Sequence, residues 1–163
     1  WWSGRYHEGL EAVGRLVEEW SGPELQTQLH FAWGLSLVGR RDEAIAAADR
    51  AASAAPGHVH AGLARMLKCG LEGDVEGVRS EFTPEFHEYC YREPTWSYFA
   101  ATAFTLAGDA DDAIQWLEHA VDIGWINYPL MAEQDPFLES LRGDPRFQEL
   151  MVRVKKEWEE FEV

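Results

Sequence analysis

The sequence predicts an all-α fold of stacked antiparallel helix pairs, and three observations support that prediction. Glycines at positions 4, 39, 73 and 108 recur 35, 34 and 35 residues apart, a period typical of helical-pair solenoids. Between them, apolar residues recur at spacings of three and four, the period of an amphipathic helix. Glycines and prolines then stand where these helical patterns stop, as they do at helix ends.

The first part of the chain contains three predicted helices. Residues 6–20 form one helix, which Ser21-Gly22-Pro23 ends, and residues 24–38 form the next, which ends at Gly39. Residues 42–54 form its partner, closed by Pro56-Gly57. This third helix is rich in alanine, and small side chains at positions such as Ala44 let two helix backbones approach closely.

The middle of the chain is less regular. A helix is expected over residues 58–71, followed by a turn at Gly73-Asp74 and a second helix over residues 75–82. Thr83-Pro84 is a good helix start, because Thr caps the first turn and Pro fits its first position. The second helix of this unit is therefore predicted to be short, with a further helix over residues 85–90.

The last part contains the best-preserved pair, at residues 95–107 and 111–123, which Gly124 ends. Asp135-Pro136 and Asp144-Pro145 then predict helices over residues 136–141 and 145–161. We expect residues 1–124 to form about three and a half helix pairs, the first one truncated. Residues 125–163 would complete the same domain as a capping segment and capping helix, because a solenoid must cover its last apolar face.

Composition excludes some classes of function. The chain has 163 residues and a formal net charge of -15, which disfavours nucleic acid and anionic membranes as partners. Two cysteines, Cys69 and Cys90, are too few for a disulfide framework, so a cytoplasmic location is expected. The chain opens at Trp1-Trp2 just before a repeat glycine, and we interpret it as the C-terminal piece of a longer protein, cut inside a repeat.

The repeats resemble the tetratricopeptide repeat. In that family, small residues follow the repeat glycine after five and twelve positions, and proline follows after seventeen; the unit with the full match is Gly39, Ala44, Ala51 and Pro56. Gly108, Ala113 and Ala120 also match, but Trp125 replaces the proline, and the units at Gly4 and Gly73 are degraded. The resemblance implies a tetratricopeptide-like α-α solenoid, a right-handed superhelix, with a C-terminal capping helix.

The tail is similar to the end of the repeat arrays that close many bacterial serine/threonine kinases, adenylate cyclases and winged-helix regulators. The residues that carry this similarity are Gly124-Trp125-Ile126-Asn127-Tyr128-Pro129, Asp135-Pro136-Phe137-Leu138 and Gly143-Asp144-Pro145-Arg146-Phe147. In those proteins the array is a regulatory or docking region. The resemblance therefore implies a scaffold for protein-protein interaction, or a regulatory C-terminal tail of a signalling enzyme or transcription regulator.

The family presents its inner groove from the first helix of each pair. By register, the predicted peptide-binding groove contains Leu29, Trp33, Leu37, His60, Leu63, Leu67, Tyr98 and Thr102. This apolar and aromatic lining suits a peptide or helix of a partner protein, of the missing upstream region, or of a second copy of the chain. The same residues could instead pack inside the solenoid or against the tail, and the sequence leaves both interpretations open.

No catalytic or cofactor motif is present. The Asn positions that some family members use to bind a peptide carboxylate hold Trp33, Leu67 and Thr102, so we reject that specificity. No Cys-x-x-Cys spacing, Gly-rich phosphate loop or HExxH motif occurs. His87 and Cys90 would share a helix face as a weak metal site, which leaves an autonomous metalloenzyme as a remote alternative. The preferred prediction is a binding module without catalytic residues, metal or cofactor.

Overall fold

The computed structural model describes residues 3–19 and 25–161, and every regular element among them is a helix, as predicted. Trp1-Trp2 and the predicted helix stop at Ser21-Gly22-Pro23 lie outside these residues. In chain order the elements are α1 (Tyr6–Glu19), α2 (Leu25–Leu37), α3 (Arg41–Ala54), α4 (Val59–Glu72), α5 (Val75–Ser80), α6 (Pro84–Arg92), α7 (Pro94–Ala107), α8 (Ala110–Asp122), η1 (Leu130–Gln134), η2 (Pro136–Leu141) and α9 (Pro145–Glu160).

The repeat glycines share one backbone conformation. Gly39, Gly73 and Gly108 have φ angles of 79°, 77° and 91°, and Gly124 has 110°. At each, the glycine N–H and the following N–H bond back to carbonyls of the preceding helix, for example Asp109 N to Phe104 O at 2.9 Å. This is the Schellman helix end, where a residue without Cβ adopts a left-handed conformation without steric cost.

Side-chain caps begin the helices where the sequence predicts them. The hydroxyl of Thr83 accepts a hydrogen bond from Phe86 N–H at the start of α6. The carboxylate of Asp109 caps α8 and that of Asp144 caps α9 in the same way. The break between α5 and α6 therefore falls at Thr83, and the second helix of that unit is short, as expected.

Most helices pack against their neighbours in the chain. The helix α7 contacts its sequence neighbour α6 and also packs against α4. The contact between α4 and α7 is close, because a Cβ atom added to Gly70 would lie 2.7 Å from Ala103 O. Ala44 and Ala113, the small residues predicted at helix contacts, are fully buried.

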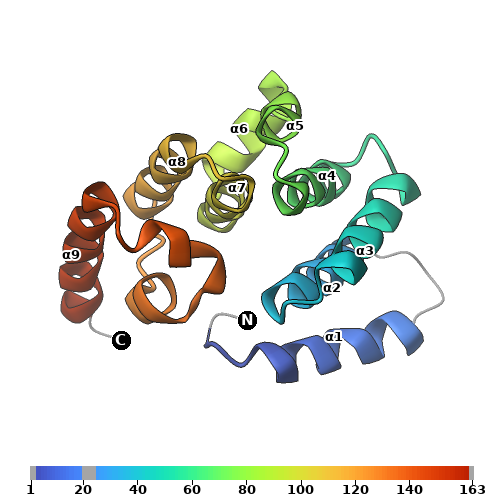
Figure 1. The fold of residues 1–163 in the computed structure, drawn as a ribbon, viewed down its shortest axis with the longest axis horizontal. Helices are drawn as coiled ribbons and strands as arrows, with labels where there is room; N and C mark the ends of the chain where they lie inside the picture. The colour runs from blue at the N-terminus through green and yellow to red at the C-terminus, as the bar shows by residue number, and fades with distance from the viewer. Residues whose placement is uncertain (1–2, 20–24, 162–163) are drawn as a thin grey trace.

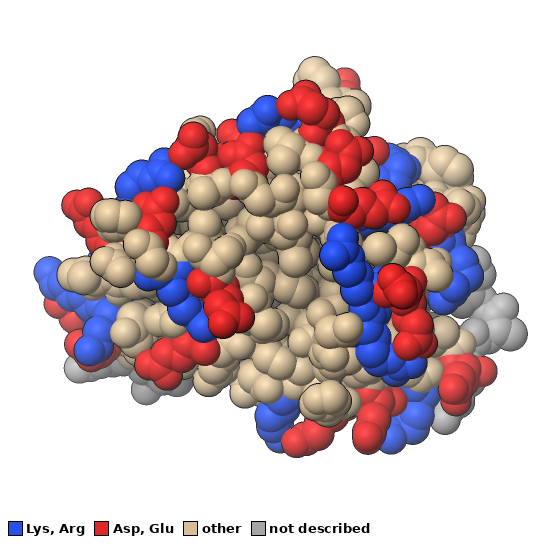
Figure 2. Space-filling model, in the orientation of Figure 1, with Lys and Arg blue, Asp and Glu red and all other residues tan. Residues whose placement is uncertain are grey.

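Figure 1 shows that the helices follow an arc from α1 through α4 and α7 to α9, with η1 and η2 on its inner side. The helices α5, α6 and α8 lie outside α4 and α7 relative to that segment. The residues before α1 contact η1, because a Cβ atom on Gly4 would lie 2.8 Å from the Gln134 side-chain oxygen. Figure 2 shows the same face, where charged side chains mainly surround an uncharged middle.

The C-terminal segment departs from the prediction in two ways. Residues 136–141 form a 3-10 helix, η2, and residues 130–134, for which no helix is predicted, form a π-helical turn, η1. In α9, Phe147, Leu150, Met151 and Val154 are buried as the capping prediction requires, but Trp158 and Phe161 are 42% and 62% exposed. The apolar stripe of α9 is thus only partly covered by the described residues.

None of the described helices has the length and apolar character to cross a bilayer.

Candidate functional site

The predicted groove residues do converge, but on a covered surface. They lie on α2, α4 and α7, and His60 alone among them is more than marginally exposed. The buried ones are Leu29, Trp33, Leu37, Leu63, Leu67, Tyr98 and Thr102, with exposed fractions between 0% and 8%. Of the two arrangements that the sequence left open, the described residues adopt the packed one, and this surface is not an open groove.

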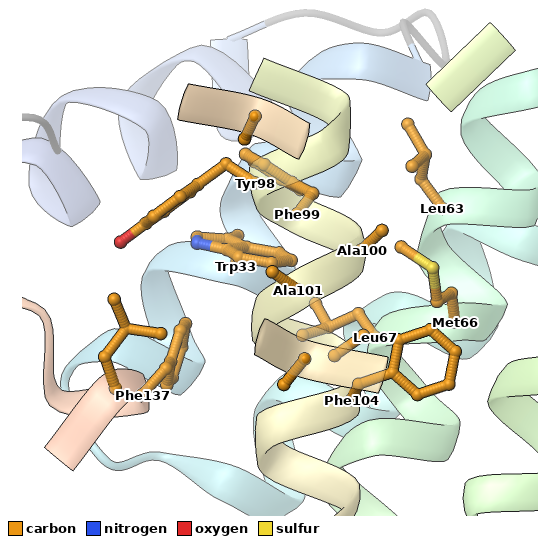
Figure 3. Packing of buried hydrophobic residues seen from close by; sticks show 14 of the residues in the cluster. Trp33, Leu63, Met66, Leu67, Tyr98, Phe99, Ala100, Ala101, Phe104 and Phe137 are labelled. Atoms are coloured by element: carbon orange, nitrogen blue, oxygen red, sulfur yellow. The ribbon is translucent and has the colours of Figure 1, made fainter. Parts of the chain in front are cut away.

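The aromatic side chains of this surface pack against residues 125–141. Trp33 stacks on Phe99 with ring centroids 3.7 Å apart, and Phe137 of η2 meets Trp33 edge-on at 5.5 Å. Figure 3 shows Trp33 lying between Phe99 of α7 and Phe137. Trp125 packs against Tyr98 at 4.9 Å. These contacts bury aromatic area that would otherwise face water.

A buried polar contact fixes the same segment. The hydroxyl of Tyr98 donates to the carboxylate of Asp135, whose other oxygen accepts from Phe137 N–H at 2.8 Å and so caps η2. Arg142 donates to the backbone carbonyls of Glu133 and Asp135. Burial raises the pKa of Asp135 above its ordinary value, although both hydrogen bonds and Arg142 act in the opposite direction.

A second surface, a hollow that we call the outer hollow, lies on the outer side of the arc, between the α5–α6 turn and α8. Its volume is about 540 Å³. The residues that line it are Arg79, Phe82, His87, Tyr91, Phe104, Asp112, Gln115, Trp116, Glu118, His119 and Asp122.

The walls of the outer hollow are aromatic rings centred on Trp116. Phe82 stacks on Trp116 with ring centroids 5.1 Å apart, and the His87 ring centroid lies 5.3 Å from that of Trp116. Tyr91 stacks on His119 and meets Trp116 edge-on at 6.1 Å. Tyr91 is 49% exposed. Unlike the inner surface, this cluster of rings is therefore open to solvent.

Helical spacing positions these rings. His87 and Tyr91 lie four residues apart on α6, and Trp116 and His119 lie three apart on α8, so each pair shares a helix face. The His119 Nε2 atom lies 2.7 Å from Tyr91 O, which joins the end of α6 to α8. Phe104 of α7 is buried and forms the floor.

The charged residues of the outer hollow are mostly acidic. Arg79 donates to Glu76 at 2.9 Å and Asp112 at 2.9 Å, and also pairs with Asp109. Asp122 accepts from Arg153 of α9 at 2.8 Å. Glu118 is exposed and makes no ion pair or hydrogen bond with the part of the chain that the structure describes.

The outer hollow was not predicted from the sequence. His87 was expected to share a helix face with Cys90 as a weak metal site, yet Cys90 is buried and His87 is exposed. Burial raises the pKa of the Cys90 thiol to about 12, and the described residues contain no group of three metal-ligating side chains. Trp116 lies on the apolar stripe of α8 and is half-buried. The sequence signal for the hollow is the spacing of His87 and Tyr91 on α6 and of Trp116 and His119 on α8. That spacing does not show that the two helices contact each other, because the contact is part of the tertiary structure.

Comparisons with protein-family models, with curated proteins and with solved structures find no match to this chain.

Proposed function

We propose that this chain is a protein-interaction module with a tetratricopeptide-like, right-handed solenoid architecture, and that a partner protein binds at the outer hollow. The regular Schellman ends at Gly39, Gly73 and Gly108 support the architecture, because they repeat one turn geometry at the period of helical-pair solenoids.

The single observation that carries the binding function is the open cluster of aromatic rings at the outer hollow. Phe82, Trp116 and His119 are half-buried, whereas His87 and Tyr91 are exposed. Aromatic side chains in open hollows dominate the energetics of protein interfaces, because they bury a large area with few rotatable bonds.

The inner surface is a poorer candidate for the partner site. A peptide that contacted Trp33 or Tyr98 would first have to displace Phe137 and Asp135. Such displacement would expose apolar area and leave the Tyr98 hydroxyl without its acceptor. The free energy of this rearrangement would be subtracted from the free energy of binding. The outer hollow requires no such rearrangement.

Selection from a random peptide library displayed on phage tests this proposal. We expect peptides that bind the wild-type chain and lose most of their affinity for the double variant Tyr91→Ala/His119→Ala. The matched control is Trp158→Ala, which removes an exposed aromatic ring on α9, outside the hollow.

The proposal would be overturned if no peptide were enriched, or if enriched peptides bound the double variant and the wild type equally. Circular dichroism of each variant separates loss of binding from loss of the fold. If peptide binding were lost only in the Trp158→Ala variant, the binding surface would lie on α9 instead.

A further inference from the structure

We infer that the outer hollow recognises the guanidinium group of an arginine side chain of its partner. This inference rests on the proposed function, because it names the chemistry of the group that the same hollow would receive. Three features of the hollow carry it: the aromatic walls, an acidic rim, and an arginine already held at one edge.

The aromatic walls offer ring faces to a flat cation. A cation over a Trp, Tyr or Phe face is attracted by the ring quadrupole, and guanidinium groups also stack flat on aromatic rings. Trp116 and Tyr91 meet edge-on rather than face to face. Tyr91 also stacks on His119, and the part of its ring that stays open beside Trp116 leaves Tyr91 49% exposed.

The acidic rim supplies the charge that a cation needs. Glu118 and Asp122 lie four residues apart on α8, so their carboxylates share one side of that helix at the hollow. Arg153 pairs with Asp122 from α9, while Glu118 is left without an ion-pair partner among the described residues. A guanidinium between the rings and Glu118 would form a charge-assisted hydrogen bond, which is stronger than a neutral one.

Arg79 shows that this environment accommodates a guanidinium. It lines the hollow from the α5 end and pairs with Asp109, Asp112 and Glu76. Three carboxylates therefore compensate the charge of Arg79. Glu118, further along α8, stays available to attract a second cation. The formal net charge of -15 adds a long-range attraction for basic segments.

Arginine fits these features better than lysine. The planar, weakly hydrated guanidinium can stack on a ring and donate to a carboxylate in the same pose. The lysine ammonium is a compact, strongly hydrated point charge, so it would lose more hydration and gain no stacking.

Nuclear magnetic resonance titration of the full 163-residue chain tests the inference, with N-acetyl-arginine amide as the probe. We expect saturable shifts of the Trp116 indole N–H and of the α8 amides near His119, with millimolar affinity. N-acetyl-citrulline amide is the matched neutral probe, since it keeps the planar shape and loses the charge. N-acetyl-lysine amide tests the preference for guanidinium.

Two exposed positions provide variants that keep the fold. Glu118→Gln should weaken binding of the arginine probe about threefold, and Tyr91→Ala should weaken it about twofold to fivefold. Glu149→Gln is the matched control, because Glu149 is an exposed glutamate on α9 outside the hollow. It should leave the dissociation constant unchanged.

Absent shifts, equal shifts with the citrulline probe, or equal effects of Glu118→Gln and Glu149→Gln would overturn the inference. Binding of the lysine probe as tight as that of the arginine probe would also overturn it. If displayed peptides bind through the hollow but the arginine probe does not, the inference fails while the proposed function stands. If the arginine probe binds but no peptide is selected, the proposed function fails instead, and the hollow is a site for small cations.

Discussion

The hydroxyl of Tyr98 on α7 donates a hydrogen bond to the carboxylate of Asp135, 37 residues later in the chain, and both side chains are almost fully buried. This contact joins the helical array to the segment that covers its inner surface. It also places an ionisable group where water cannot solvate it, so its energetics are testable.

Replacing Tyr98 by Phe should lower the free energy of unfolding by about 1–3 kcal/mol, because Asp135 would lose a donor while it stays buried. Chemical denaturation measures the loss. Tyr91→Phe is the control, since that hydroxyl belongs to an exposed residue. Equal stability of the Tyr98→Phe variant and the wild type would mean that the bond contributes nothing net.

The charge of Asp135 should make stability depend on pH in a defined direction. Its pKa is raised above 3.8 in the folded state, chiefly by burial, so the folded chain binds a proton more tightly than the unfolded chain does. Stability from this group therefore falls as pH rises from about 3.8 through the folded pKa. The free energy of unfolding of the wild type minus that of Asp135→Asn should decrease across this window.

Acid titrations of the two proteins in parallel measure that difference. Other carboxylates, such as Asp144, have a lowered pKa and change stability in the opposite direction, but they are common to both proteins and cancel. A difference that increases with pH would contradict the assignment of a raised pKa to Asp135.

Trp33→Ala should destabilise the chain by about 3–5 kcal/mol, because Trp33 is 1% exposed and stacked on Phe99. Thermal and denaturant unfolding measure the effect. The control, Trp158→Ala, removes a ring that is 42% exposed, and its effect should be much smaller. A Trp33→Ala variant that kept its stability but lost partner binding would restore the inner-groove hypothesis.

Gly70→Ala should cost about 1–3 kcal/mol, because the new methyl group would lie 2.7 Å from the backbone carbonyl of Ala103. Backbone cannot move aside as a flexible side chain can. Gly143→Ala is the control: its added Cβ would meet nothing within 4 Å, so it should be neutral or slightly stabilising. Thermal unfolding measures the effect. Equal thermal unfolding midpoints for the two variants would show that α4 and α7 can separate at little cost in stability.

Ala44→Leu and Ala113→Leu should each lower stability by about 1–3 kcal/mol through overpacking, because both alanines are fully buried at helix contacts. Ala54→Leu, at an exposed position of α3, provides the control. Unchanged thermal midpoints for both buried substitutions would argue against the predicted repeat register.

The sequence was sufficient to predict the α-helices and their approximate ends, but not the turn η1, because helix ends depend on neighbouring residues. The spacing of apolar side chains indicates the helical period, Gly39, Gly73 and Gly108 mark left-handed helix ends, and Thr83 and Asp144 mark caps. Each signal acts within about one helical turn, so it can be read without knowing the fold. The 3-10 geometry of η2 was not predicted, since Asp135-Pro136 specifies a start but not the type of turn that follows.

Tertiary structure alone decided which aromatic residues are covered. Trp33 and Trp116 both lie on apolar helical stripes in the sequence, yet Trp33 is buried under Phe137 while Trp116 lines an open hollow. The difference arises because residues 125–141 return along the inner side of the arc, and no comparable segment among the described residues covers the outer side. Burial depends on contacts between residues far apart in the chain, and local periodicity carries no information about where a distant segment will pack.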